Sequence, residues 1–472
     1  MENKTRNRIL LVLFFGVLMG ALDIAIVGPA MPAIQRTYSG ITERSLAWIF
    51  SAYVLFNLVG TPIMAKLSDL YGRRIIYIVD VSLFALGSLI VAFAPGFNFI
   101  LLGRAVQGFG AGGIFPVASA VIGDTFPAEK RGTALGLIGA VFGLAFIVGP
   151  ILAGVILSVT TWHWLFLINL PIALLLIIFS ARLLPSVRTV DRAVFDWSGM
   201  IVLSLMLGAM TFGLNQIDTA RFIASLISLD VLPYLAAAVA LGLILVQVER
   251  RASNPILPAV LFGSRQLKLG YFLSAGAGVG ESAIVFMPLL AVAALNGIQE
   301  NQASFLLMPV VLAMAVGSPL VGRLLDRIGS KLVILTGLVI LGVGVFLLSQ
   351  FASSMFLFIG SGVLIGLGMS TLLGAPIRYI TLNEVSAENR STAQGAVTVF
   401  TSIGQLVGAA LVGAVAASRG GGVEGYSTGF LVIAMLSVMM IAAAVGLKPR
   451  RDELKPAAPS PEPSAASQPK TL

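Results

Sequence analysis

The ten residues AKLSDLYGRR at 65–74 carry four charged side chains in a chain in which only 11% of residues are charged. A second stretch, GRLLDRIGSK at 322–331, repeats the pattern 257 residues later. The repeat aligns Leu67 with Leu324, Asp69 with Asp326, Gly72 with Gly329 and Arg74 with Lys331. A repeat at this distance indicates that the chain is duplicated.

The composition indicates an integral membrane protein. Of the 472 residues, 57% are hydrophobic and the mean hydropathy is +0.98, so too little polar surface exists to cover a soluble fold. A bilayer core of about 30 Å needs about 20 apolar residues per helix. We therefore expect an all-α protein with fourteen transmembrane helices, near 9–33, 45–65, 75–94, 98–122, 132–157, 164–183, 197–216, 231–248, 269–294, 302–321, 332–350, 354–375, 391–416 and 427–447.

The distribution of positive charge predicts the orientation of these helices. When the connections are assigned alternately to two sides, nearly all of the 30 Lys and Arg residues fall on the side of the N-terminus. The exceptions are Arg36, Arg44, Arg221 and Arg419 on the other side, and Arg104 inside a helix. The positive-inside rule then places both termini in the cytoplasm, in a multi-pass protein of the cell membrane. The scattered positive charges argue against a nucleic-acid partner.

The position of the repeat predicts the domain organisation. We expect a six-helix bundle at 1–183, a linker with two extra transmembrane helices at 184–268, a second six-helix bundle at 269–448, and a disordered cytoplasmic tail at 449–472. The tail is rich in Pro, Ala and Ser. Two parallel six-helix bundles are the layout of alternating-access carriers, whose substrate site lies between the halves.

Several stretches together resemble the major facilitator superfamily, and within it the fourteen-span drug:proton antiporter family of the QacA/EmrB type. The loop at 65–74 and its copy are similar to the motif G-x-L-a-D-R-x-G-R-K, although Ala65 and Leu70 depart from it while Gly322 and Arg327 keep it. The other matching stretches are ALDIAIVGPAMPAI, in which Gly28 replaces a usual Asn, GRAVQGFGAG, GLAFIVGPILAG and TWHWLFLINLP, in which His163 replaces a usual Arg.

The resemblance implies that the two loops lock a cytoplasmic gate while the carrier is open to the outside. A turn that only fixes topology is the alternative. From the residues themselves, Gly72 permits a tight turn, and Asp69 is expected to cap the start of the third helix while reaching a basic neighbour. The residues assigned to the gate loops are Asp69, Gly72, Arg73, Arg74, Gly322, Asp326, Arg327, Gly329 and Lys331.

Three ionisable residues inside the predicted helices are candidates for proton coupling. A charge at the centre of a helix costs about 2.5–3.5 kcal/mol on insertion scales and persists where it is paired, hydrated or functional. Asp23 and Arg104 are expected at a shared depth. Asp23 is a candidate proton carrier, with Arg104 as a fixed cation that holds a neighbouring carboxylate ionised until a proton or substrate replaces it; a permanent ion pair is the alternative. Glu281 lies near the middle of its helix with no basic residue at its depth, which favours a titrating role. Asp80 is expected to be a solvated acid near a helix end or the partner of a basic loop residue.

Other intramembrane residues suggest close packing and a polar interior. Glycines at a spacing of three or four let helices touch, and a proline bends its helix. In the antiporter-like helix these are Gly143, Gly149, Pro150 and Gly154, which the resemblance connects with sealing a leak path, whereas plain packing is the alternative. Polar side chains that could face a cavity or bond between helices are Tyr53, Asn57, Gln107, Asn169 and Gln405.

The sequence therefore predicts a proton-coupled antiporter that exports hydrophobic or amphipathic small molecules by alternating access. Its partners would be that substrate, protons and the lipid bilayer. An exporter of a lipid or another long-chain metabolite is one alternative, and a non-transporting membrane sensor or scaffold is another. No enzyme activity, cofactor or metal site is expected, because the chain has no cysteine and one histidine and lacks a catalytic cluster.

Overall fold

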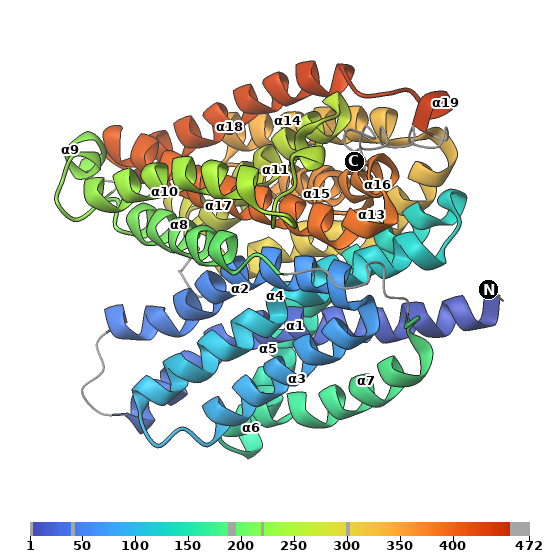
Figure 1. Ribbon diagram of the computed structural model, residues 1–472. Coiled ribbons are helices and arrows are strands. Elements are labelled where there is room, and N and C mark those ends of the chain that lie inside the picture. The colour runs from blue at the N-terminus through green and yellow to red at the C-terminus, as the bar shows by residue number, and fades with distance from the viewer. Residues whose placement is uncertain (1–2, 39–42, 187–194, 219–220, 299–302, 454–472) are drawn as a thin grey trace, which may run out of the picture.

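A computed structural model describes residues 3–38, 43–186, 195–218, 221–298 and 303–453. Within these ranges, fourteen helices are long and apolar enough to cross a membrane, and the regular structure is helical throughout. The expected all-α class with fourteen spans is therefore confirmed. Figure 1 shows two stacked layers of helices, one built from each half of the chain.

The first half of the chain forms the lower bundle in Figure 1. Its core contains fully buried side chains such as Leu13, Phe84 and Val121. The helices are α1 (Asn3–Thr37), α2 (Glu43–Tyr71), α3 (Arg73–Ala92), α4 (Phe97–Thr125), α5 (Ala128–Val159), the short α6 (His163–Leu167) and α7 (Asn169–Leu183).

The second half forms the upper bundle, around buried residues such as Leu338, Phe358 and Phe430. Its elements are α11 (Arg265–Ala294), η3 (Ser304–Leu307), α13 (Met308–Ile328), α14 (Ser330–Phe351), α15 (Met355–Leu372), α16 (Ala375–Glu384), η4 (Ala387–Asn389), α17 (Arg390–Ser418), α18 (Gly422–Val445) and α19 (Arg450–Glu453).

Within each bundle, one pair of helices packs closely at a glycine, and the two glycines occupy equivalent positions in the repeat. A Cβ added to Gly108 on α4 would lie 2.3 Å from the backbone oxygen of Tyr53 on α2. In the second bundle, a Cβ on Gly366 of α15 would lie 2.2 Å from the backbone oxygen of Val310 on α13. Small residues allow this close approach in a membrane, where packing rather than the hydrophobic effect holds helices together.

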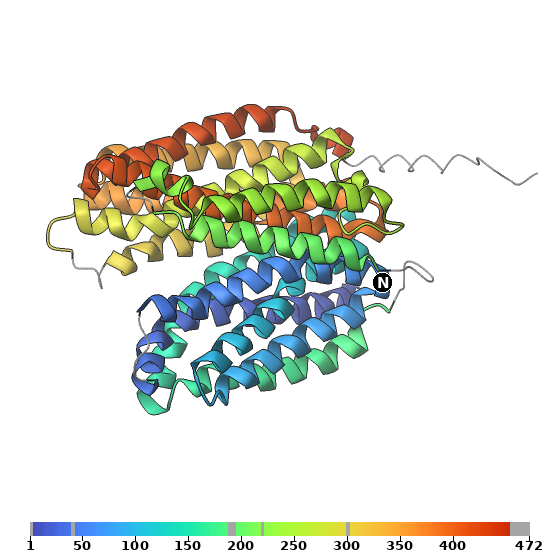
Figure 2. The same ribbon diagram turned by 60° about the vertical axis from the view of Figure 1, so that its left-hand side comes forward.

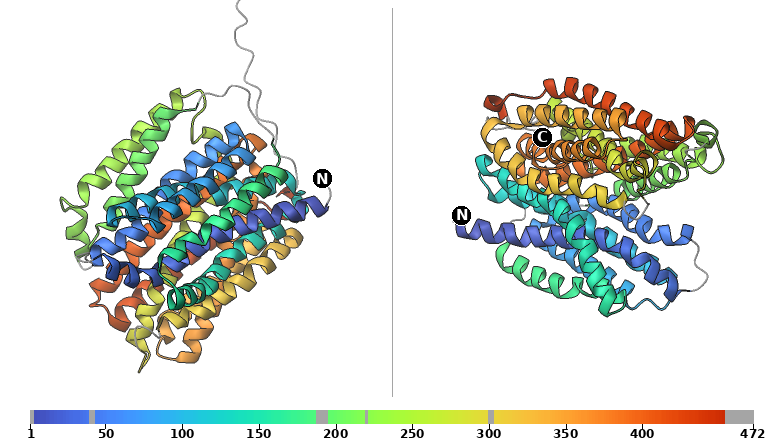
Figure 3. Two further views of the ribbon diagram at one scale, coloured as in Figure 1. Left: turned by 90° about the horizontal axis from the view of Figure 1, so that it is seen from below. Right: turned by 180° about the vertical axis from the view of Figure 1, so that it is seen from behind.

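The segment between the bundles contains α8 (Trp197–Asn215), α9 (Phe222–Leu226), α10 (Leu232–Arg251) and η2 (Ala259–Phe262). Figure 3 shows α8 and α10 as a pair at one flank of the molecule. This pair packs against α2 through a cluster that includes Leu58, Leu203 and Leu245, and the rings of Trp48 and Phe212 lie 6.1 Å apart. The two extra helices therefore cover one edge of the boundary between the bundles.

The start of α1 and the last described helix, α19, lie on the same side of the molecule (Figure 2). The segments 65–74 and 322–331, which we call the gate loops, also lie there, and we call it the gate-loop side. The expected disordered tail differs in its first residues, because Arg450–Glu453 form α19 and bond to the second gate loop. Residues 454–472 of that tail lie outside the described residues.

Candidate functional site

Asp69, at the end of α2, bonds to the start of α17 in the other bundle. Its carboxylate accepts hydrogen bonds from the backbone N–H groups of Ser391 (3.1 Å) and Thr392 (2.7 Å), and from the Thr392 hydroxyl (2.5 Å). A carboxylate is favourable there because a helix N-terminus has free N–H groups and a partial positive charge. The expectation that Asp69 caps α3 is wrong, since Gly72 is the N-cap residue of α3 and no side chain caps that helix.

Asp326, at the equivalent position on α13, bonds to the start of α5 in the first bundle. It accepts hydrogen bonds from the N–H groups of Gly132 (2.9 Å) and Thr133 (2.8 Å) and from the Thr133 hydroxyl (2.6 Å). Each bundle thus caps a helix of the other. Among the described residues, all side-chain hydrogen bonds between the bundles lie at the gate-loop side.

The sequence analysis missed the residues that donate hydrogen bonds to these two carboxylates. They occupy a second internal repeat, RGTALG at 131–136 and RSTAQG at 390–395. The Thr of each copy donates to a carboxylate of the opposite bundle. Gly132 also leaves no space for a side chain, because a Cβ there would lie 2.7 Å from the backbone oxygen of Gly322. A search for repeats beyond the gate loops would have found this motif.

The charges around the first gate loop form a connected chain. Arg73 pairs with Asp69 one helical turn away and donates to Asp124 (3.1 Å) and to the backbone oxygen of Ala387 (2.7 Å). Asp124 also accepts from Arg390 of the second bundle (2.6 Å). This chain links α2, α3, α4 and α17, and the Asp69–Arg73 pair is almost completely buried.

The second gate loop replaces these charges with neutral residues and with a contribution from α19. Ser330 stands where the first loop has Arg73, and Asn383 stands where α4 has Asp124. The carboxylate of Glu453 accepts from the N–H and hydroxyl groups of Ser330. Arg450 donates to the backbone oxygen of Asp326 and to the Tyr379 hydroxyl. The two gate loops therefore share the position of the capping carboxylate but differ in the side chains that surround it.

Two further pairs in the gate loops are equivalent. Gly72 and Gly329 have φ angles of 100° and 88°, in the region that favours glycine, and each joins two helices by a tight turn. Arg74 donates to the backbone oxygen of Leu184 (2.6 Å), and Lys331 donates to that of Val445 (2.6 Å). Each cation thus meets the free carbonyls at the end of the last long helix of its own bundle.

Arg327, the remaining predicted gate residue, is exposed and makes no ion pair or hydrogen bond with another described residue. This side chain makes a natural control for substitutions elsewhere in the gate loops.

Asp23 and Arg104 meet in a fully buried network inside the first bundle. Arg104 Nη1 lies 2.5 Å from Asp23 Oδ2, and both side chains have no exposed surface. Gln107 donates to Asp23 Oδ1 (2.7 Å) and accepts from Arg104 (2.6 Å), while Asn169 of α7 donates to the same Asp23 oxygen (3.3 Å). Arg104 also lies 4.2 Å from the centre of the Tyr53 ring.

Five of the predicted residues thus belong to one network with Ser88, which we call the Asp23 network: Asp23, Tyr53, Arg104, Gln107 and Asn169. It joins α1, α2, α3, α4 and α7, and its carboxylate has partners on both oxygens. Because the members of this network are buried and bond to one another, the loss of any one partner is costly.

Glu281 occupies the equivalent position in the second bundle. The stretch LDIAIV at 22–27 aligns with GESAIV at 280–285, which pairs Asp23 with Glu281. The side chain of Glu281 is part-exposed and makes no ion pair or hydrogen bond with another described residue. Gly362 stands 258 residues after Arg104, so the second bundle lacks the cation that pairs with Asp23 in the first.

Two buried polar residues lie where the sequence analysis did not expect them. Asp80 is fully buried, and neither carboxylate oxygen has a hydrogen-bond partner among the described residues, which contradicts the expectation of a solvated acid. Arg378, expected in a connecting loop, lies on α16 against the ring of Phe115 at 3.7 Å. It also donates to Gln394 (3.2 Å) and so marks a polar point between the bundles.

The remaining candidates are distributed rather than gathered. Asn57 is half-buried on α2 and Gln405 is exposed on α17, and neither side chain bonds to another described residue. On α5, Gly143 faces Ala315 of α13, and Gly149 faces Ala25 of α1. Pro150 is exposed within the helix, and nothing lies within 4 Å of a Cβ placed on Gly154.

No group of three or more acidic or histidine side chains in the described residues could hold a metal ion.

Comparison with known sequences gives consistent relatives. The Major Facilitator Superfamily profile matches residues 13–280 and 267–471. The uncharacterized transporter YfiU of Bacillus subtilis is 34% identical over 85% of this chain and 78% of its own length. The multidrug transporter protein MdtP of the same organism is 32% identical over 89% and 77%. The multidrug resistance protein Stp of Mycobacterium tuberculosis is 29% identical over 88% and 77%.

Two solved structures share the fold. The human organic anion transporter MFSD10 (TETRAN) has a TM-score of 0.68 at 16% identity and covers 94% of this chain and 100% of that one. The proton:xylose symporter XylE has a TM-score of 0.66 at 12% identity and covers 94% and 95%.

Proposed function

Because the chain belongs to the Major Facilitator Superfamily, we propose that this membrane transporter exports a hydrophobic or amphipathic small molecule in exchange for protons. Two observations support export: relatives at about 30% identity that are named multidrug transporters, and fourteen spans of the expected drug:proton antiporter type. We place the protein in the cell membrane with the gate-loop side in the cytoplasm, since the Lys and Arg residues concentrate there.

The contrast between Asp23 and Glu281 carries the proposal of proton coupling. The two acids occupy equivalent positions, but Asp23 has partners on both oxygens and Glu281 has none among the described residues. Asp23 is bonded to an arginine and two amides, an arrangement that suits fixing the positions of the helices that carry them. A carboxylate without such partners is free to bind and release a proton as its surroundings change. We therefore assign proton carriage to Glu281 and a positioning role to the Asp23 network.

The closed gate between the bundles supports alternating access as the transport mechanism. The gate-loop side is closed by two helix caps between the bundles. We propose that this state faces the outside, where Glu281 takes up a proton and the substrate leaves. We propose that protonation of Glu281 and occupancy by the substrate favour opposite states, inward-open and outward-open. Protonation also removes the cost of moving the charge of Glu281 through a dry intermediate.

The test uses purified protein in liposomes that contain a fluorescent pH reporter. Adding a transported solute should release protons, and Glu281→Gln should abolish that release while substrate still binds. Asp23→Asn serves as the matched comparison for proton release. Loss of the Asp23 carboxylate should disturb folding or substrate affinity rather than coupling alone. Proton release that persists in Glu281→Gln would contradict the assignment. Solute movement without any proton flux would favour a carrier of another kind, and flux only with lipid substrates would favour lipid export.

A further inference from the structure

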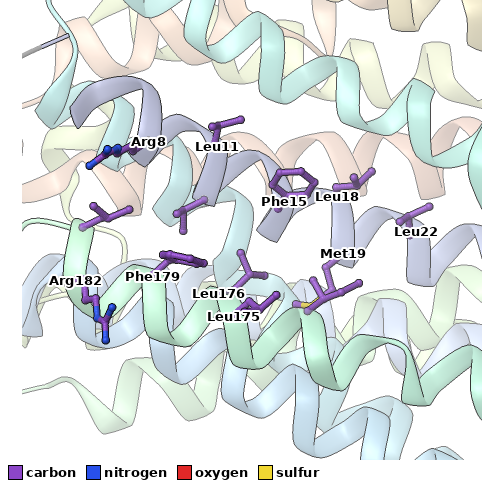
Figure 4. A pocket seen from close by; sticks show the side chains of 13 residues that line it. Arg8, Leu11, Phe15, Leu18, Met19, Leu22, Leu175, Leu176, Phe179 and Arg182 are labelled. Carbon is purple, nitrogen blue, oxygen red and sulfur yellow. The ribbon is translucent and has the colours of Figure 1, made fainter. Parts of the chain in front are cut away.

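A long apolar groove lies between α1 and α7 in the first bundle. It has a volume of about 710 Å³ and is shown in Figure 4. Its walls are Leu, Ile, Val, Phe and Met side chains, of which Leu11, Phe15 and Leu175 are each at least half exposed. The groove is therefore open rather than filled by the protein.

Among the residues that the structure describes, two arginines at one end are the charged side chains that line the groove. Arg8 is near the start of α1 and Arg182 is near the end of α7, and Figure 4 shows them at the same end of the groove. Both are exposed, and neither makes an ion pair or hydrogen bond with another described residue. Two cations without an acidic partner among the described residues therefore stand at the gate-loop end of an apolar groove.

The dimensions of the groove fit one leaflet of a bilayer. Its lining on α1 runs from Arg8 to Leu22, which is about 21 Å at 1.5 Å per residue. One leaflet contributes about 15 Å of hydrocarbon, and the headgroup region lies beyond it. A lipid with its phosphate between the arginines would thus place an acyl chain along the groove.

The equivalent helices of the second bundle leave no such space at the corresponding point. There α11 packs against α18, and a Cβ on Gly276 would lie 2.5 Å from the sulfur of Met440. The open groove is therefore a local property of α1 and α7 and does not follow from the repeated fold.

We propose that this groove is a binding site for an anionic phospholipid of the leaflet on the gate-loop side. The phosphate binds Arg8 and Arg182, as anionic headgroups bind basic pockets between helices, and an acyl chain fills the groove. The deep end of the chain reaches Leu22, next to Asp23, while Ile172 lies one turn from Asn169. A bound lipid would therefore stabilise the spacing of α1 and α7 across which Asn169 and Asp23 bond. This proposal is independent of the transported substrate and of proton coupling.

The test measures lipid retention by native mass spectrometry of the full-length protein, with phosphatidylglycerol and phosphatidylcholine of identical chains. Phosphatidylglycerol should be retained preferentially. Each arginine is worth about 1 kcal/mol near an anionic headgroup, or about fivefold in affinity. Arg8→Ala with Arg182→Ala should thus reduce retention of phosphatidylglycerol by about 30-fold. Retention of phosphatidylcholine should fall much less, because its choline cation already offsets the charge of its phosphate. The charge-retaining pair Arg8→Lys with Arg182→Lys should keep most of the preference.

Two controls locate the site. Arg323→Gln removes an exposed arginine of α13 on the same side and should leave retention unchanged. A photoactivatable phosphatidylglycerol should crosslink to peptides from α1 and α7, and Leu18→Trp should reduce that crosslinking by filling the groove. Equal retention of both lipids, an unchanged preference in the double alanine variant, or crosslinks confined to other helices would each overturn the proposal.

Discussion

At the scale of single residues, Arg104 has the most demanding environment in the first bundle. It is fully buried with Asp23, donates to Gln107 and to the backbone oxygen of Ile49 (3.1 Å), and packs on Tyr53. A buried ion pair contributes little net stability compared with an apolar pair, but removal of one partner leaves a charge without compensation. The contribution of Arg104 to stability therefore depends on the charge of Asp23, which it compensates.

We expect Arg104→Gln to lower the free energy of unfolding by about 3–5 kcal/mol, because Asp23 then remains buried without a cation. Asp23→Asn combined with Arg104→Gln should recover most of this loss, since the pair becomes two neutral amides. Thermal unfolding of purified protein, followed by circular dichroism, measures both. If the double variant is as unstable as the single one, Arg104 acts through packing and not through charge.

At the scale of helix pairs, the two bundles share a contact between a polar side chain and a glycine, but the two residues have swapped helices. Asp80 of α3 faces Gly113 of α4, where an added Cβ would lie 2.1 Å from Asp80 Oδ2. In the second bundle the glycine is Gly337 of α14, and the polar side chain is Thr371 of α15. Each interface accommodates one polar side chain against one glycine, on opposite helices.

This exchange predicts a compensating double substitution. Gly113→Thr alone should strongly reduce the yield of folded protein, because the new side chain would overlap the Asp80 carboxylate. Asp80→Gly with Gly113→Thr reproduces the arrangement of the second bundle and should restore the yield. Size-exclusion chromatography of detergent-solubilised protein measures the folded fraction. A double variant that folds no better than Gly113→Thr would contradict this account.

The short helix α19 has a role at the same scale, because it substitutes for charges that the second gate loop lacks. A chain that ends at Lys448 loses the hydrogen bonds that Ser330 donates to Glu453 and those that Arg450 donates to the backbone oxygens of Leu325 and Asp326. We expect the second gate loop to open more often in this truncated protein. The chain has no cysteine, so Leu325→Cys, at a fully buried position, supplies a unique reporter. Its maleimide labelling should rise severalfold on truncation, and an unchanged rate would show that α19 does not restrain the loop.

At the scale of the whole molecule, the two helix caps set the balance between closed and open gates. Loss of a cap costs about 0.5–2 kcal/mol, which corresponds to a change of about 2- to 30-fold in the open population. Asp69→Asn should have the larger effect, since Asp69 also pairs with buried Arg73, whereas Asp326 is half-buried. Transport should fall while insertion is unchanged, and spin-label distances between α2 and α17 should report the opening. Arg327→Gln should leave both unchanged.

The sequence predicts the architecture well because composition, length and the repeat of the gate loops all bear on it. The fourteen spans, their two bundles and the burial of polar residues near Arg104 follow from such features. The partner of Asp69 does not, because it lies 323 residues away and capping is usually read from nearest neighbours. Arg378 was misplaced for a related reason, since α16 continues beyond the glycine at 374 that ends the apolar run.

The crossed arrangement of the caps also constrains how the protein is made. Asp69 is synthesised long before Thr392, and Asp326 follows Thr133 by nearly two hundred residues. At about 5–20 residues per second, a ribosome needs roughly 16–65 s to travel between Asp69 and its partner. During that interval the first bundle is in the membrane with its gate acid still hydrated. Closure of the gate is therefore a late event of biogenesis, because each cap needs residues from both bundles.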